Sequence, residues 1–250
     1  MIEIKNIEKY FGDNNVLKNV SFSFEKGKTN LIIGESGSGK TTLLKILVGL
    51  HKNDQGAVLF NGEDVNKMNN KELRMLRKEI GMLFQGAALY DYMTVEENIM
   101  FPLSMFTNKT ENEMLERVNF CLQRVNLEKK NHLMPAELSG GMKKRVAIAR
   151  AIVMQPKYLF CDEPNSGLDP RTAIVIDNLI QEITKEYNIT TIVNTHDMNS
   201  VMQIGTNIAF IHKGKVWWQG SKEDLLKTDN KELTNFVFAS DLFKRLKKSS

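Results

Sequence analysis

The sequence predicts an α/β fold built on a mostly parallel sheet. Short apolar runs, several of which end in glycine or in a carboxylate, alternate with stretches whose apolar residues recur every three or four positions. Strands that alternate with helices of this length indicate a parallel sheet with crossover helices. The middle third of the chain is mainly helical in pattern, so we interpret it as a helical insertion into the α/β core.

The N-terminal part is expected to form short strands with one buried face. Turn-like sequences at 12–15 and 25–28 separate these strands. Apolar residues fall at every second position, as in a half-buried strand. The residues on this face are Ile2, Ile4, Val20, Phe22 and Phe24.

The next segment predicts a buried strand, a glycine loop and a helix in immediate succession. The strand covers 29–34, and the helix covers 43–50, where Gly49 and the following polar turn should end it. Further along, 57–62 predicts a strand, 71–80 a short helix, and 80–85 another strand.

The rest of the chain continues this alternation. Helices are predicted over 112–125 and 143–153, a strand over 158–162, and a final strand over 189–195. The helix between these last two strands places its apolar residues on one face: Ile176, Leu179, Ile180 and Ile183.

Composition excludes several classes of protein. The chain has 250 residues, 42% of them hydrophobic, and a net charge of +4, so neither disorder nor nucleic-acid binding is expected. It contains no apolar run of the ~20 residues that a membrane span needs. Its first ten residues lack the apolar region of a signal peptide. Cys121 and Cys161 have no metal-ligand spacing, so we expect reduced thiols in the cytosol.

Residues 34–41, GESGSGKT, match the phosphate-loop pattern between a predicted strand and a predicted helix. Backbone N–H groups and the positive end of the helix dipole would bind the phosphates of ATP. Lys40 would reach the β- and γ-phosphates, the Thr41 hydroxyl would bind Mg²⁺, and Thr42 would donate to the α-phosphate. The predicted nucleotide-binding residues are Gly34, Glu35, Ser36, Gly37, Ser38, Gly39, Lys40, Thr41 and Thr42.

A second group of candidate residues ends the strand at 158–162. Asp162 lies at the carboxyl end of that strand, where α/β proteins bind ligands, and can hold Mg²⁺. Glu163 is adjacent and faces another way, so it can activate a water molecule toward the γ-phosphate as a general base.

The string LSGGM at 138–142, together with these two motifs and their order, resembles the signature of ATP-binding-cassette (ABC) ATPases. Ser139, Gly140 and Gly141 offer a hydroxyl and bare N–H groups at a helix start, a second phosphate-binding surface. The resemblance implies that this surface closes on the ATP of a second copy of the chain, so that two subunits sandwich two ATP.

The resemblance also implies the fold in more detail. It implies a P-loop NTPase (RecA-like) core of mostly parallel sheet, with an N-terminal antiparallel β subdomain and an inserted α-helical subdomain. We expect one ABC ATPase domain over 1–250, with the core at 1–86 and 156–228, the helical signature subdomain at 87–155 and a C-terminal tail at 229–250.

Further residues match family motifs one at a time. Gln85 matches the glutamine that contacts Mg²⁺ and the attacking water, and His196 matches the histidine that contacts the γ-phosphate. Asp169, in the string SGLD at 166–169, matches the loop that crosses the dimer interface. Phe11 matches the aromatic residue that stacks on adenine, although the adjacent Tyr10 offers a second ring. The implied reaction is ATP hydrolysis by Glu163, His196, Gln85 and Lys40.

One cassette without a membrane span implies a separate permease. The segments 82–103 and 134–151 and the tail look like the ATPases of Mla/MCE-type lipid transporters, which implies phospholipid transport and a partner with an MCE domain. Such a subunit lies at the cytoplasmic face of the inner (plasma) membrane. The alternatives are an importer of small solutes, a lipoprotein-release system or, less in keeping with a single cassette, a soluble ABC protein.

Two apolar stretches stay ambiguous at this point. Residues 86–103 are too irregular for a plain amphipathic helix, and either contact a partner or join the helical core. The tail either reaches the second subunit or packs on its own domain, through Phe236, Phe238, Leu242 and Phe243. Its basic cluster is expected to be a solvated end: Lys244, Arg245, Lys247 and Lys248.

Overall fold

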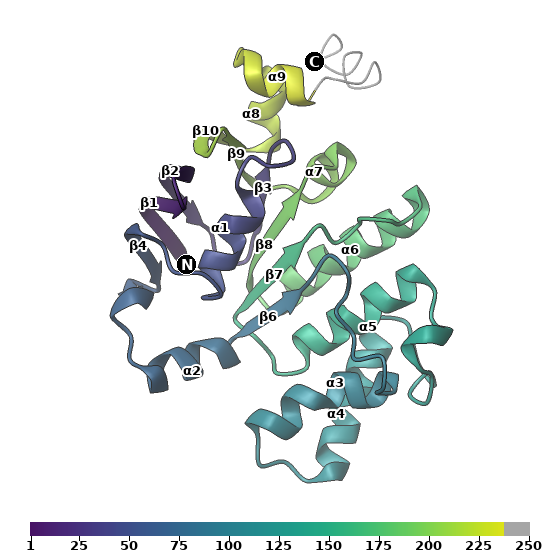
Figure 1. Cartoon of the computed structure of the whole chain (residues 1–250). Coiled ribbons are helices and arrows are strands. Elements are labelled where there is room, and N and C mark those ends of the chain that lie inside the picture. Colours follow the sequence, from purple (N-terminus) through teal and green to yellow (C-terminus); the bar gives the residue numbers. More distant parts are fainter. Residues whose placement is uncertain (238–250) are drawn as a thin grey trace. The chain divides into compact units, whose positions relative to one another are not determined.

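The computed structural model describes residues 1–237, and the chain forms two compact units (Figure 1). The first unit comprises Met1–Asn69 together with Thr190–Ser250, and the second comprises Asn70–Ile189. Most of the predicted apolar face of the tail, and its basic cluster, lie outside the described residues: Phe238, Leu242, Phe243, Lys244, Arg245, Lys247 and Lys248.

The first unit contains an antiparallel sheet in the order β2-β1-β4-β5. Its strands are β1 (Ile2–Phe11), β2 (Asn14–Phe24), β4 (Gln55–Phe60) and β5 (Glu63–Asp64). In this sheet Ile2 is paired with Phe24 on one side and with Phe60 on the other. All five residues of the predicted face are buried, which confirms that the alternating pattern marks the inner side of the strands.

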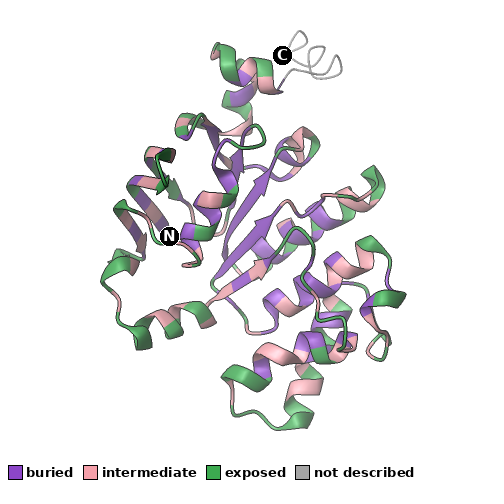
Figure 2. Cartoon of the chain, viewed as in Figure 1, coloured by how far each residue is buried: buried purple, intermediate pink, exposed green. Residues whose placement is uncertain are grey.

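The same unit holds a second group of strands around β3 (Thr29–Ile33). This strand pairs in parallel with β8 (Thr190–Thr195) and with β9 (Asn207–His212), and β10 (Lys215–Gly220) pairs antiparallel with β9. Every residue of β3 and β8 is buried (Figure 2). Burial of the whole strand is expected for parallel strands, because both faces of a parallel sheet are covered.

Short helices complete the first unit. They are the 3₁₀ helix η1 (Val65–Lys67), α1 (Lys40–Leu47), α7 (Met198–Ile204), α8 (Lys222–Lys227) and α9 (Lys231–Val237). Phe236 of α9 packs against Phe210 of β9 with ring centroids 5.4 Å apart, so the described part of the tail contacts its own unit.

The second unit combines two parallel strands with five α-helices and one 3₁₀ helix among the described residues. Strand β6 (Ile80–Leu83) pairs with β7 (Tyr158–Asp162), and Leu83 lies opposite Cys161. The helices are α2 (Asn70–Lys78), α3 (Val95–Phe106), α4 (Glu111–Arg124), α5 (Gly140–Ile152) and α6 (Pro170–Glu186), with η2 (Pro135–Glu137) before α5. The predicted apolar face of α6 is buried. Helix α2 has no buried residue (Figure 2).

The expectation for 86–103 was wrong in one respect, because Val95–Phe106 is a regular helix. A capping box starts α3: Thr94 Oγ1 accepts from the Glu97 N–H, and the Glu97 carboxylate accepts from the Thr94 N–H. Pro102 inside the helix masks the helical pattern. Other boundaries shift by a few residues, so that Gln85 lies beyond the end of β6 and α1 begins at Lys40.

Two expectations from composition can be compared with residues 1–237. Within that range, no helix is both long and apolar enough to cross a bilayer. Cys121 and Cys161 are buried free thiols.

Candidate functional site

The glycine loop runs from the end of β3 to the start of α1, and its shape requires glycine at two positions. Gly34 has φ +150°, and a Cβ there would lie 2.2 Å from the Ile211 carbonyl oxygen. Gly39 has φ +106°, and a Cβ there would lie 2.8 Å from Leu17 Cδ2. At Gly34 a Cβ would overlap the main chain of β9, and at Gly39 the positive φ and the Leu17 side chain of β2 both disfavour a Cβ.

The centre of the loop is open and rich in donors. Gly37 has φ +78°, and a Cβ there would meet nothing within 4 Å. Helix α1 has no side-chain cap and no acidic residue in its first turn, so its first N–H groups can bind an anion. The buried hydroxyl of Ser38 has no hydrogen-bond partner among the described residues. These features fit a bound phosphate chain.

Lys40 is held inside the loop. Its ammonium donates to the carbonyl oxygens of Gly34 and Glu35, at 2.9 Å each, and the side chain is 6% exposed. An ammonium that spans the loop in this way has its charge where phosphate oxygens would bind. The predicted contact of Lys40 with the β- and γ-phosphates stays a prediction.

Thr41 contacts strand β8 through a residue that sequence reasoning did not identify. Asn194 Nδ2 donates to Thr41 Oγ1 at 3.3 Å. Asn194 lies in the buried strand β8, two residues before His196, which is exposed just beyond the strand. Because β8 also contains three threonines, no local sequence signal singles out Asn194.

The two aromatic candidates for adenine differ in their contacts. The Tyr10 hydroxyl donates to Glu8 at 2.7 Å, a hydrogen bond that raises the pKa of Tyr10. The Phe11 ring is 47% exposed, with the Lys9 ammonium 5.4 Å from its centroid and the His51 ring edge-on at 5.7 Å. Phe11 thus presents the freer aromatic surface.

In the second unit, the two candidate carboxylates follow each other at the end of β7. Asp162 is the last residue of the strand and is 9% exposed. Glu163 has φ +48°, a left-handed conformation that costs a non-glycine residue about 1 kcal/mol or more. Backbone strain of this kind is often found at functional sites.

Gln85 lies close to the turn that follows Glu163. Its side-chain amide donates to Ser166 Oγ at 3.2 Å. The main-chain carbonyl of Gln85 accepts from the Lys144 ammonium, which also donates to the Glu163 carbonyl at 3.3 Å. The structure thus brings Gln85, Glu163 and the start of the SGLD string together, and adds Lys144, which sequence reasoning missed.

The signature motif forms the start of α5. Ser139 caps this helix by accepting from the Met142 N–H at 3.3 Å. Gly141 approaches the side chain of Thr172, and Asp169 caps α6 by accepting from the N–H groups of Arg171 and Thr172. Hydrogen bonds from Thr172 lower the pKa of Asp169. Asp169 and Ser139 therefore both act as helix caps in this chain.

Thr41 in the first unit and Asp162 in the second each carry an oxygen of the kind that Mg²⁺ binds. Residues 1–237 contain no group of three or more His, Cys, Asp or Glu side chains that could hold a metal ion. Mg²⁺ at nucleotide sites characteristically uses one or two protein ligands, together with phosphate oxygens and waters. Thr41 and Asp162 are of the right type. When bound, ATP would supply the phosphoryl group, and Mg²⁺ would neutralise the charge of its phosphates.

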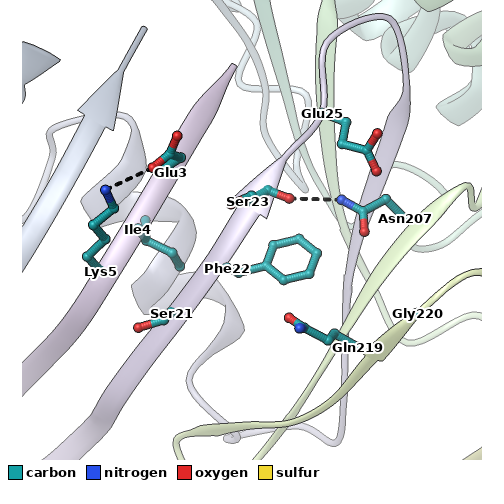
Figure 3. A pocket seen from close by; sticks show the side chains of 10 residues that line it. All are labelled: Glu3, Ile4, Lys5, Ser21, Phe22, Ser23, Glu25, Asn207, Gln219 and Gly220. Carbon is teal, nitrogen blue, oxygen red and sulfur yellow. Dashed lines mark hydrogen bonds and ion pairs between the residues drawn. The ribbon is translucent and has the colours of Figure 1, made fainter. Parts of the chain in front are cut away.

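A separate hollow of about 680 Å³ lies in the first unit (Figure 3). The Phe22 ring points toward it, Glu3 and Lys5 form an ion pair of 3.1 Å at its edge, and Asn207 donates to the Ser23 carbonyl at 2.9 Å. None of the candidate site residues lines it. It is therefore distinct from the glycine loop.

A buried parallel strand, a glycine loop and an uncapped helix together define a nucleoside-triphosphate-binding protein. Comparison with known proteins makes the class specific. Residues 17–166 match the family model described as "ABC transporter". The methionine import ATP-binding protein MetN of Clostridium tetani is 43% identical over 97% of this chain and 76% of its own length. The chain belongs to the ABC transporter family, as an ATP-binding subunit.

Two further likenesses bear on fold and assembly. The intermembrane phospholipid transport system ATP-binding protein MlaF of Haemophilus influenzae is 39% identical over 95% of this chain and 90% of its own length. The dimeric structure of MJ0796, a bacterial ABC transporter cassette, matches with a TM-score of 0.81 and 34% identity over 88% of this chain and 98% of that one. MJ0796 is also known as a dimer in a post-hydrolysis state with ADP and Pi.

These findings confirm the predicted fold class, the P-loop NTPase core with an antiparallel β part and inserted helices. The chain is an ATPase whose hydrolysis of ATP is coupled to transport, and it uses ATP with Mg²⁺. Cassettes of this family dimerise and work with transmembrane permeases, to which they bind as peripheral subunits. The Mla group, however, is not singled out, because MetN matches at least as well as MlaF.

Proposed function

We propose that this chain is the ATP-hydrolysing subunit of an importer for a small solute of the amino-acid class. The observation that carries the proposal is its 43% identity with a methionine import ATP-binding protein over nearly the whole chain. This favours the small-solute alternative over the lipid transporter that the sequence strings suggested. The importer's permease would hold the chain at the cytoplasmic face of the membrane.

Lipid transport remains a second candidate, because MlaF matches at 39% over 90% of its own length. It would require a permease with an MCE-domain partner. The ATPase site does not discriminate between the two, since ATP chemistry is common to both. The permease and its substrate-binding protein determine the substrate.

The experiment that separates the two is purification of the tagged full chain with its membrane partner, followed by ATPase assays in liposomes. For an importer, we expect copurification of a permease and stimulation of ATP turnover by the solute-binding protein with L-methionine or another amino acid. Copurification of an MCE-domain protein, with stimulation by phospholipid only, would overturn the importer proposal in favour of the lipid one.

Within the site we propose the following division of roles. Lys40, with the amides of 34–39, binds the β- and γ-phosphates, Thr42 donates to the α-phosphate, and Phe11 stacks on adenine. Thr41, Asp162 and Gln85 hold Mg²⁺ or its waters. The buried Lys40 ammonium and the open space at Gly37 support this assignment.

Hydrolysis is assigned to Glu163 as the general base, with His196 at the γ-phosphate. The signature residues Ser139, Gly140 and Gly141, with Asp169, are assigned to the ATP of the second copy. The left-handed backbone at Glu163 supports a functional constraint at this residue.

Glu163→Gln tests the assignment of the base. We expect ATP turnover to fall at least ~100-fold, while ATP binding stays within about threefold of wild type, because only the proton acceptor is lost. Equal melting temperatures of Glu163→Gln and the wild type would exclude a loss of folding as the cause. Turnover of Glu163→Gln near the wild-type value would show that the base lies elsewhere.

The exposed apolar residues of 84–106 are proposed as the permease contact. Tyr92 is 74% exposed and Met105 55%, whereas Val95, Ile99 and Leu103 of the same segment are buried. Exposed apolar side chains next to a rigid helix are typical of protein contacts. Under this proposal the segment has a buried side that joins the helical core and an exposed side that contacts the permease.

A further inference from the structure

Helix α5 carries a buried lysine that the proposed reaction does not use directly. Lys144 is 4% exposed, although its charge would ordinarily be solvated. Burial lowers the pKa of its ammonium, and the neighbouring carboxylates of Asp162 and Glu163 act in the opposite direction. A buried ammonium needs hydrogen-bond acceptors, and here two main-chain carbonyls accept from Lys144.

The two carbonyls that Lys144 binds belong to the two residues assigned to the attacking water. One is the carbonyl of Gln85, and the other is the carbonyl of Glu163, at 3.3 Å. The Glu163 carbonyl also accepts from the Ser166 N–H at 3.1 Å, and Ser166 Oγ accepts from the Gln85 side chain at 3.2 Å. These hydrogen bonds close a ring that passes through Lys144, Gln85, Ser166 and Glu163.

The ring connects four segments of the second unit. They are the start of α5 after the signature motif, the loop after β6, the end of β7 and the SGLD string. Within this ring Glu163 has the left-handed φ of +48°, which neighbouring contacts must stabilise. A hydrogen bond from a cation to a carbonyl is stronger than one between neutral groups, so Lys144 is well suited to hold this turn.

A second cation on the same helix holds the next part of the loop. Arg150 donates to the carbonyl oxygens of Ala87 and Ala88, at 2.7 Å each. Both alanines have positive φ, 63° and 49°. Helix α5 therefore fixes the main chain on both sides of Gly86, through one cation near its start and another near its end.

We propose that Lys144 is a positioning residue that sets the main chain at Gln85 and Glu163 together, so that the signature helix determines the placement of the general base. Lys144 itself does not touch the nucleotide or the water. Its removal should misplace Glu163 without altering the glycine loop, which belongs to the first unit. The expected effect is therefore on turnover and not on ATP binding.

The test compares substitutions of Lys144 with a matched change at Arg145. Arg145 is the next residue on α5 and also donates to two carbonyls, those of Val125 and Asn126 at 3.2 and 2.8 Å, but these hold no candidate site residue. The variants are Lys144→Met, Lys144→Gln and Arg145→Met in the full chain. The measurements are kcat and KM for MgATP and the melting temperature.

For Lys144→Met we expect kcat to fall about tenfold to a hundredfold, the scale of effect of a displaced catalytic group, with KM within about threefold. Lys144→Gln keeps two N–H donors, and its kcat should stay within about threefold of wild type. Arg145→Met should lower the melting temperature to a similar extent but leave kcat near wild type.

Two results would overturn the proposal. One is an equal loss of kcat in Lys144→Met and Arg145→Met at matched stability, and the other is a folded Lys144→Gln whose KM for MgATP rises tenfold or more while its kcat stays near wild type. The second remains measurable if Lys144→Met does not fold. Because the proposal rests on the assigned role of Glu163, Glu163→Gln is assayed in parallel. Its failure to lose activity would refute the base assignment alone, whatever the Lys144 variants show.

Discussion

At the scale of single residues, the glycines of the phosphate loop have two different tasks. Gly34 and Gly39 are required by the fold, because β9 and β2 leave no room for a Cβ. Gly37 faces open space, so its lack of a side chain serves the ligand. The motif pattern contains all three, but only the packing shows which is structural and which is functional.

This difference predicts the behaviour of two alanine variants. Gly34→Ala should lower the free energy of unfolding by about 2 kcal/mol or more, because Cβ would overlap a backbone carbonyl. Gly37→Ala should cost only ~1–2 kcal/mol for its left-handed backbone, yet weaken ATP binding at least tenfold. Urea denaturation and nucleotide titration measure the two effects. Equal stability losses would contradict the distinction.

The buried cysteines give a prediction about pH and reactivity. Burial raises the pKa of Cys121 to about 11, and it also raises the pKa of Cys161. Both thiols should therefore resist a disulfide reagent at pH 8 in the native protein and react at once in urea.

Stability from the neutral Cys121 thiol is fully present below pH 9 and is lost as pH rises toward 11. Cys121→Ala should reduce this loss of stability between pH 9 and 11. A free energy of unfolding that depends on pH in the same way in the variant and the wild type would contradict the prediction.

At the scale of elements, α3 and the loop before it depend on one buried amide. Asn98 is fully buried, accepts from the Tyr90 N–H at 2.8 Å, and donates to the carbonyls of Tyr90, Met93 and Thr94. The side chain replaces hydrogen bonds that the irregular segment cannot make by itself. Together with Arg150 it fixes the loop that presents Tyr92.

We predict that Asn98→Ala lowers the free energy of unfolding by about 2–3 kcal/mol, because several buried main-chain groups lose their partner. The control is Asn131→Ala, whose amide donates only to the side chains of Glu96 and Asn119. Water can replace it there, so its cost should be under ~1 kcal/mol. Denaturant titration of both variants measures these losses in the free energy of unfolding. Similar losses for the two variants would exclude a special role for Asn98.

At the scale of the whole molecule, the candidate residues divide between the two units. The first unit holds Phe11, the glycine loop and His196, and the second holds Gln85, Asp162, Glu163 and the signature. Cassettes of this family form dimers, as in the structure of MJ0796. Transport therefore requires the assembly of ATPase subunits with a permease.

Gly140→Asp tests the assembly. A Cβ at Gly140 would meet only Leu168 Cδ2, at the ordinary distance of 3.5 Å, so the fold should accept a side chain. The added carboxylate would repel the phosphates of the partner's ATP. In the Glu163→Gln background, wild-type Gly140 should give an ATP-dependent dimer by sedimentation, and Gly140→Asp a monomer that still binds ATP. A stable dimer of Gly140→Asp would refute the assigned role of the signature.

The candidate site residues could be proposed from sequence because phosphate chemistry needs particular residues at fixed spacing. The glycine loop, the carboxylates after β7 and LSGGM are local strings, each next to an apolar run that predicts its strand or helix. Asn194 and Lys144 could not be found in this way. Asn194 bonds a hydroxyl 153 residues away in the chain, and Lys144 bonds a carbonyl 59 residues away.

The sequence alone determined the α/β class and the family and allowed an ATP site to be proposed, because backbone periodicity and phosphate binding leave local patterns. It did not determine the helix at Val95–Phe106, where Pro102 interrupts the pattern that the capping box starts. Only the tertiary structure decided which glycines the fold requires, what Asp169 and Ser139 bind, and how Lys144 joins Gln85 to Glu163. These depend on close approach between distant segments, and such contacts form only once the chain is folded.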